Sequence, residues 1–198
     1  MALNLNFNPS NIFCTEQGTY IRFIAWIPPS DDSWRLNFGS YNEDDDESGF
    51  IGVGCLLRDD KAVFKAGYAD AYSDCGDNIT LVELKALKVG LLLAVKNGVD
   101  YIEIEGDNSI VVRILKGEII PLCPVLKDIT AECVEIMIKS FRQIIIRRID
   151  VNGNKGATGL AIVGFDNQKT FSWQNEAPQG INKILINDVI GRWIAIGR

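Results

Sequence analysis

Histidine is absent from the 198 residues of this chain. A Ser-His-Asp or Cys-His catalytic unit therefore cannot be built from it, and a histidine-ligated zinc site is excluded as well. No apolar run approaches the roughly 20 residues that cross a bilayer. The first six residues place no basic group ahead of an apolar stretch, so we expect no secretory signal and no membrane partner.

Cysteine is scarce and unpatterned. The five cysteines are scattered and include no Cys-x-x-Cys pair. This is typical of reduced thiols, and we expect an intracellular protein of the cytoplasm or nucleus. Positive charge is also in short supply, because the net charge is −6. An acidic chain binds nucleic acid only through a local basic face, since its overall field opposes the contact.

The remaining composition, with 47% hydrophobic residues, fits one domain with a real core. Residues 1–30, punctuated by Asn and Pro, are interpreted as an N-terminal leader. We place the domain at 31–165 and interpret 166–198, which has weak periodicity, as a C-terminal tail. Five consecutive acidic residues at 43–47 predict a solvated loop, because like charges do not pack together.

Alternating and β-branched runs predict strands at 34–38, 50–57, 62–71, 101–105 and 143–149. Helical spacing predicts a long helix that ends near Lys96, capped by Asn78 or Thr80, and further helices at 109–115, 125–140 and 157–163. Three hairpin-connected strands followed by helix-linked strands predict an α/β fold. It would be a mixed five-stranded sheet with flanking helices.

Several motifs occur in a recognisable order, and a further echo lies in the tail. They are Trp26–Pro29 with Trp34–Ser40, Gly52–Asp59, Glu83–Ala94, Ile102–Val112, and the echo Leu185–Gly191. In this order they resemble the ribonuclease H-like domain of plant proteins, of the type 1, retroelement-derived kind. The resemblance covers residues 26–165 and implies the ribonuclease H fold.

The resemblance also implies a chemistry, metal-assisted hydrolysis of the RNA strand in an RNA–DNA hybrid. In that family two Mg²⁺ ions are held by carboxylates from the first strand, the first helix, the fourth strand and the last helix. Here Glu83 and Asp107 match the second and third positions. Phe38 stands where the first aspartate should precede glycine, unless one residue is deleted there, and Thr158 stands at the last position. The histidine usual near the last helix is also missing.

The missing carboxylates lead to the main hypothesis, a catalytically impaired domain (a pseudoenzyme) that acts as a binding module. Glu83 and Asp107 alone would hold no cofactor, or at most a weak, mostly hydrated Mg²⁺. We expect a protein partner first and an RNA–DNA hybrid second, because phosphates would meet the acidic loop. The alternative is an active Mg²⁺-dependent ribonuclease H with a rearranged site that uses Asp150 or this loop. A relic without activity is a third possibility.

Each candidate residue also has a simpler interpretation. Glu83 follows Thr80 at the spacing of a helix-capping pair, and Asp107 lies in an ordinary strand-end turn. Arg147 and Arg148 belong to the one basic concentration and are weak candidates for nucleic-acid contact. Charges of this kind also protect the edge strands of sheets.

Overall fold

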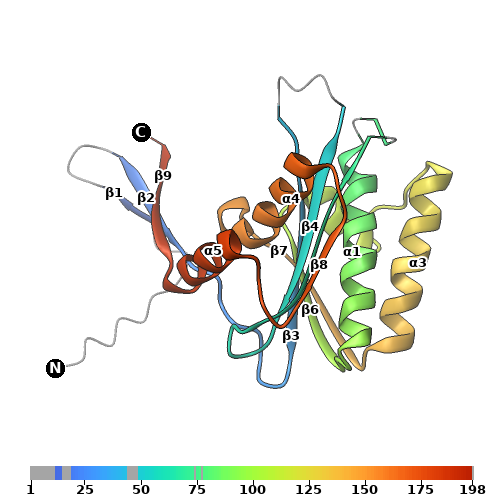
Figure 1. Ribbon diagram of the computed structural model, residues 1–198, viewed down its shortest axis with the longest axis horizontal. Coiled ribbons are helices and arrows are strands. Elements are labelled where there is room, and N and C mark those ends of the chain that lie inside the picture. The colour runs from blue at the N-terminus through green and yellow to red at the C-terminus, as the bar shows by residue number, and fades with distance from the viewer. Residues whose placement is uncertain (1–11, 15–18, 44–48, 74, 77, 198) are drawn as a thin grey trace.

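The computed structural model describes residues 12–14, 19–43, 49–73, 75–76 and 78–197. They form a six-stranded sheet with helices on both faces and a separate three-stranded sheet (Figure 1). In chain order the elements are β1 (Ile12–Cys14), β2 (Tyr20–Ile24), β3 (Trp34–Tyr41), β4 (Ile51–Arg58), β5 (Phe64–Tyr72), α1 (Ile79–Lys96), β6 (Tyr101–Gly106), α2 (Ser109–Leu115), α3 (Pro124–Ser140), β7 (Gln143–Arg148), the short 3₁₀ helix η1 (Val151–Gly153), α4 (Lys155–Asn167), β8 (Phe171–Gln174), α5 (Gln179–Ile190) and β9 (Arg192–Gly197).

The main sheet has the order β7-β6-β3-β4-β5-β8. Strands β3, β4, β5 and β8 pair antiparallel, whereas β6 and β7 extend the sheet from β3 in parallel. The predicted mixed α/β sheet with flanking helices is therefore confirmed. The five predicted strands correspond to β3–β7, and β8 adds a sixth from the segment interpreted as a tail.

Helices cover both faces of the main sheet. In Figure 1, α1 and α3 lie to the right of the sheet, and α4 and α5 lie to its left. On the α1 side, alternate residues of β3, Leu36 and Phe38, enter a core that they share with Leu84 and Leu87 of the helix. A smaller core on the other side includes Leu160 of α4.

Glycine explains how closely α4 approaches the sheet. A Cβ at Gly54 would lie 2.4 Å from the Ala157 carbonyl oxygen, and one at Gly52 would lie 2.2 Å from the Ala161 carbonyl oxygen. No side chain fits at such distances. The backbone of α4 therefore packs directly on the Gly-x-Gly of β4, and this contact fixes where the helix begins relative to the strands.

The N-terminus of α1 resolves an open choice. Asn78 is the cap, because its side-chain oxygen accepts a hydrogen bond from the Leu81 amide at 3.1 Å. Glu83 does not reach back to cap the helix but lies buried, 4% exposed, against the sheet. Its interpretation as a capping residue is therefore wrong.

The segments at the two ends of the described chain meet. Strand β2 pairs antiparallel with β9, and β1 completes the small sheet at the left of Figure 1. The Trp26 amide donates to the Asp188 carbonyl of α5 at 2.8 Å, and α5 packs on α4. Of the predicted acidic loop only Glu43 is described, and residues 44–47 lie outside the described residues. No described helix is both long enough and apolar enough to span a bilayer.

Candidate functional site

The two retained carboxylates, Glu83 and Asp107, lie together at one end of the sheet. Glu83 comes from the first turns of α1, and Asp107 directly follows β6, which runs parallel to β3. The Ser40 hydroxyl at the end of β3 donates to Glu83 Oε1 at 2.8 Å. The topology therefore unites the helix and strand positions that the sequence singled out.

Burial controls the charge of Glu83. Desolvation raises its pKa to about 7, and the nearby charge of Asp107 acts in the same direction. Hydrogen bonds from Ser40 and Asn108 oppose this rise. The second carboxylate oxygen, Oε2, is buried and has no hydrogen-bond partner among the described residues. At neutral pH this side chain is therefore divided between its acid and its carboxylate, whereas a magnesium ligand must be ionised.

An amide occupies the other side of the site. Nδ2 of the buried Asn154 donates to Asp107 Oδ1 at 2.7 Å and to the Phe38 carbonyl oxygen at 2.8 Å. The side chain thus ties the start of α4 to the ends of β3 and β6. It also presents N–H hydrogens to the oxygen atoms that a cation would need.

The direction of the side chains on β3 corrects one assignment. Neighbouring strand residues face opposite sides of a sheet. The fully buried Phe38 ring lies in the core beneath α1 and against Gly106, where an added Cβ would be 2.5 Å from Phe38 Cζ. A Cβ at Gly39 would instead lie 3.6 Å from Asp107 Oδ1 and 3.1 Å from Asn154 Nδ2. Gly39, rather than Phe38, is therefore the β3 position that faces Asp107.

Helix α4, which contains Thr158, brings no carboxylate to this point. The Thr158 hydroxyl bonds the Asn154 carbonyl within α4, at 3.1 Å, and Thr158 lines a hollow next to Ile184 of α5. Asp150, the suggested substitute, lines a hollow of about 320 Å³ together with Asp107. Its carboxylate, however, is paired with Arg22 and accepts from the Asn152 amide at 2.9 Å. Partial burial favours the acid, but these partners prevail and lower the pKa of Asp150.

The two arginines of β7, Arg147 and Arg148, contact different residues. Arg147 Nη1 lies 3.1 Å from Glu103 Oε2, and Arg148 Nε donates to the Asp107 carbonyl oxygen at 3.2 Å. Because β7 is an edge strand of the main sheet, both side chains are partly exposed, as expected for charges that guard an edge. Only Arg148 contacts a residue of the site.

A buried ionic network between β3 and β6 was not predicted from the sequence. Arg35 of β3 pairs with Glu103 and with Glu105 of β6, the latter at 3.2 Å between Nη1 and Oε1. Arg35 lies opposite Glu103 in the parallel register, and Asn37 lies opposite Glu105, to which its amide donates at 3.3 Å. The signal was present in the sequence as alternating polar residues on two strands, but it has meaning only once their pairing is known.

The donors at this end of the sheet do not fit a centre of two metal ions. Two carboxylates lie near one another, Glu83 bonded by the Ser40 hydroxyl and Asp107 by the Asn154 amide. Among the described residues no group of three or more acidic, cysteine or histidine side chains has a metal-binding arrangement. A pair of Mg²⁺ ions requires more oxygen ligands than these residues supply.

Comparisons with known proteins agree with the architecture. A family model described as reverse transcriptase-like matches residues 37–163. Ribonuclease H1 from Halobacterium salinarum superimposes with a TM-score of 0.61 at 23% identity, over 68% of this chain and 98% of that one. The N-terminal ribonuclease H domain of a Mycobacterium tuberculosis protein gives 0.61 at 20% identity, over 69% and 95%.

A third structure was solved with a nucleic acid. LC11 ribonuclease H1, in complex with an RNA/DNA hybrid, gives a TM-score of 0.57 at 19% identity, over 68% of this chain and 96% of that one. At these identities the structures establish the shared fold. A search of curated protein sequences found no match.

Proposed function

The chain belongs to the reverse transcriptase-like family and has the ribonuclease H fold, and from this premise we propose that it is a binding module that does not cleave RNA–DNA hybrids. The observation that carries the proposal is the pair Gly39 and Asn154. Where β3 faces Asp107 there is a glycine, and the amide of Asn154 fills the space beside it. A carboxylate that bridges two cations has no residue to supply it there.

A protein partner fits the surface better than a polynucleotide. The connection between α2 and α3 exposes a run of apolar side chains, with Ile120 78% and Leu122 87% exposed. Exposed apolar groups that gather in this way are typical of interaction sites. The net charge of −6 opposes a polyanion, so hybrid binding is proposed as weak and dependent on the arginines of β7.

The proposed location is intracellular, and it rests on thiol chemistry. Three cysteines whose side chains are described, Cys55, Cys123 and Cys133, are free. Free thiols in this number are typical of reducing compartments. A fluorescent fusion expressed in cells tests this part, and secretion of the fusion into the medium would contradict it.

Cleavage is tested with a labelled RNA–DNA hybrid, first in Mg²⁺ and then in Mn²⁺. Ribonuclease H1 from Halobacterium salinarum serves as the positive control, and the matched variant is Glu83→Gln, which keeps the size of the side chain. We expect no cleavage by the wild-type chain above that of the variant. Cleavage that disappears in Glu83→Gln would overturn the proposal and establish a rebuilt metal site.

Binding is tested separately by fluorescence anisotropy with an uncleavable hybrid. We expect weak binding at 50 mM salt that is lost at 200 mM, because phosphate contacts release counterions. The double variant Arg147→Gln/Arg148→Gln should abolish it, whereas Arg113→Gln on α2, where the arginine pairs with Glu118, should not. Tight binding that resists salt would make nucleic acid, rather than protein, the main partner.

A further inference from the structure

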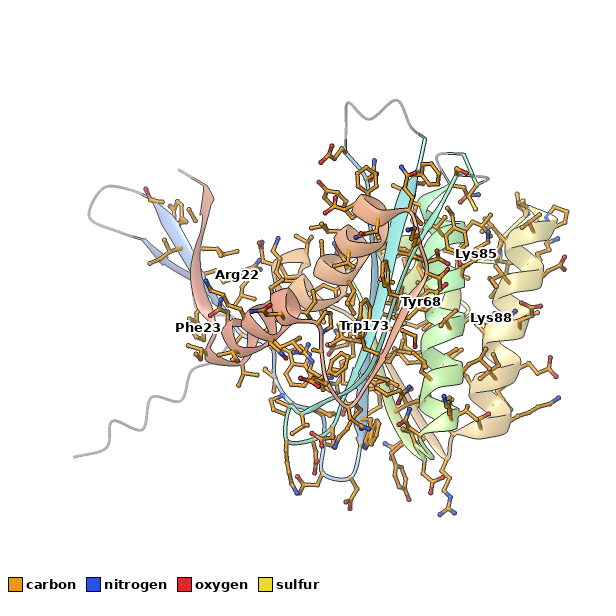
Figure 2. The ribbon with its side chains drawn as sticks, viewed as in Figure 1. Arg22, Phe23, Tyr68, Lys85, Lys88 and Trp173 are labelled. Carbon is orange, nitrogen blue, oxygen red and sulfur yellow. The ribbon has the colours of Figure 1, made fainter. Side chains whose placement is uncertain are left out.

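A cavity of about 550 Å³ lies beside the candidate site, between the segment 22–30 and the edge of the main sheet formed by β6 and β7. Neither Glu83 nor Asp107 lines it. It adjoins the smaller hollow at Asp107, with which it shares Arg22, Arg148 and Asp150. Figure 2 labels Arg22 where the small sheet meets the rest of the molecule.

One wall of the cavity is apolar. It is formed by consecutive residues from the end of β2 onward, among them Ile24, Ile27, Pro28 and Pro29. Ile27 is 54% exposed, so this wall continues to the surface. Such a surface accommodates the flat or aliphatic part of an organic molecule and gains from its removal from water.

Guanidinium groups that are already held in place also line the cavity. Arg22 is paired with Asp150, Arg147 with Glu103, and Arg148 with the carbonyl oxygen of Asp107. Each of these contacts uses one nitrogen of a group that has five N–H donors. The other donors remain for an acceptor in the cavity, and their orientation is fixed before a ligand arrives.

The balance of charge in the lining favours an anion. Four arginines line the cavity, with Arg35 at its floor, against the three carboxylates Glu103, Glu105 and Asp150. Arg35 contacts both glutamates, and Arg22 neutralises Asp150. Arg148, which donates to the backbone carbonyl oxygen of Asp107 and pairs with none of these three carboxylates, is left as the excess cation.

We propose that this cavity binds an organic phosphate of nucleotide size. The phosphate lies at Arg147 and Arg148, whose planar forks match its oxygens. The organic part lies on the wall from Ile24 to Pro29. The volume falls in the range of pockets for small organic ligands, about 300–1,000 Å³, and exceeds what inorganic phosphate fills. This inference goes beyond the proposed function and holds whether or not the domain cleaves hybrids.

Isothermal titration of the full chain with adenosine monophosphate, inorganic phosphate and adenosine tests the two halves of the site. We expect adenosine monophosphate to bind at least 10-fold more tightly than either half alone. Two results overturn the proposal: no heat of binding with adenosine monophosphate at millimolar concentration, or equal affinity for inorganic phosphate, which would reveal only an anion trap.

Two variants locate the binding. Arg148→Gln removes the excess cation, and Ile27→Asp places a negative charge on the apolar wall; each is expected to weaken binding at least 10-fold. Both side chains are exposed, so the fold tolerates the changes, and thermal unfolding verifies this. The matched controls Arg113→Gln and Ile138→Asp make the same chemical changes at exposed positions elsewhere and should leave the affinity unchanged. Equal affinity in all four variants would place the ligand outside this cavity.

Discussion

The pKa values of two buried glutamates of this domain, Glu83 and Glu103, are shifted in opposite directions. They are 4% and 1% exposed, so desolvation favours the neutral acid at both. At Glu103 the hydrogen bonds from Ser30 and the charge of Arg35 outweigh burial and lower the pKa. At Glu83 only neutral hydrogen bonds oppose burial, and the pKa rises to about 7. The partner, rather than the depth of burial, decides the charge.

The same difference in partners distinguishes two clusters of carboxylates, one between β3 and β6 and the other at the end of the sheet. In the network of Arg35, Glu103 and Glu105 the protein supplies its own cation. At the end of the sheet, the described side-chain partners of Glu83 and Asp107 are all neutral: the Ser40 hydroxyl and the amides of Asn108 and Asn154. Without a cation of their own, these two carboxylates have only neutral donors to offset burial, and this is why the pKa of Glu83 is raised.

The largest expected effect comes from breaking the network. Arg35→Met keeps the apolar stem but leaves Glu103 and Glu105 without the guanidinium between them. We expect the free energy of unfolding at neutral pH to fall by about 3–5 kcal/mol, since removing one partner strands buried charge. Urea unfolding measures it. A loss below about 1 kcal/mol would mean that Arg147 and Ser30 are sufficient to stabilise the buried carboxylate of Glu103 without Arg35.

Replacing Glu83 should raise the free energy of unfolding at neutral pH, whereas Arg35→Met should lower it. Because the folded pKa of Glu83 is raised from 4.5 to about 7, its contribution to stability is complete below pH 4.5 and is lost as pH rises through 7. Glu83→Gln removes this dependence. Relative to wild type, the variant should therefore gain about 3 kcal/mol between pH 4 and pH 8. Urea unfolding at both pH values, in a chelator, measures the difference, and parallel pH profiles would contradict it.

A restored carboxylate should give the end of the sheet a response to metal. Gly39→Asp places a carboxylate beside Asp107 once the Asn154 amide shifts slightly. We expect Mg²⁺ at about five times its Kd to stabilise this variant by about 1 kcal/mol, and the uncharged Gly39→Asn not at all. Thermal unfolding with and without Mg²⁺ measures the effect. Phe38→Asp should lose stability without this response, and the reverse result would return the lost aspartate to position 38.

The smallest effect sets the baseline for the comparison. Arg113 and Glu118 form an exposed pair, with side chains 56% and 50% exposed and atoms 3.4 Å apart. Water screens such a pair, so Arg113→Met should change the free energy of unfolding by less than about 0.5 kcal/mol. Urea unfolding beside Arg35→Met measures it. An effect as large as that of Arg35→Met would show that exposure does not distinguish the two pairs.

Much of the fold was predictable because its signals are local. Strands β3–β7 carry alternating or β-branched runs, and α1 has its Asn78 cap and ends before Asn97-Gly98. The elements after residue 166 were not predicted. Strand β8 is four residues long, and α5 is held by distant contacts of Ile181 and Leu185 in the core on α4. Such stabilisation is tertiary and leaves little periodicity in the sequence.

For the candidate site, residue identities were readable but side-chain directions were not. The sequence identified Glu83 and Asp107 as candidate site residues, and the fold places them near one another. Whether Phe38 or Gly39 faces Asp107 depends on the register of β3, because a shift of one residue turns every side chain of the strand to the other face of the sheet. The role of Asn154 required the same knowledge, because its two acceptors lie on β3 and after β6.

The pairing of β2 with β9 has a consequence for the order of assembly during synthesis. Residues 192–197 leave the ribosome more than 160 residues after β2, their partner strand. The main sheet from β3 to β7 can form while that partner is still missing, because all its members precede residue 149. The small sheet is therefore completed only after these strands, once β9 has been synthesised.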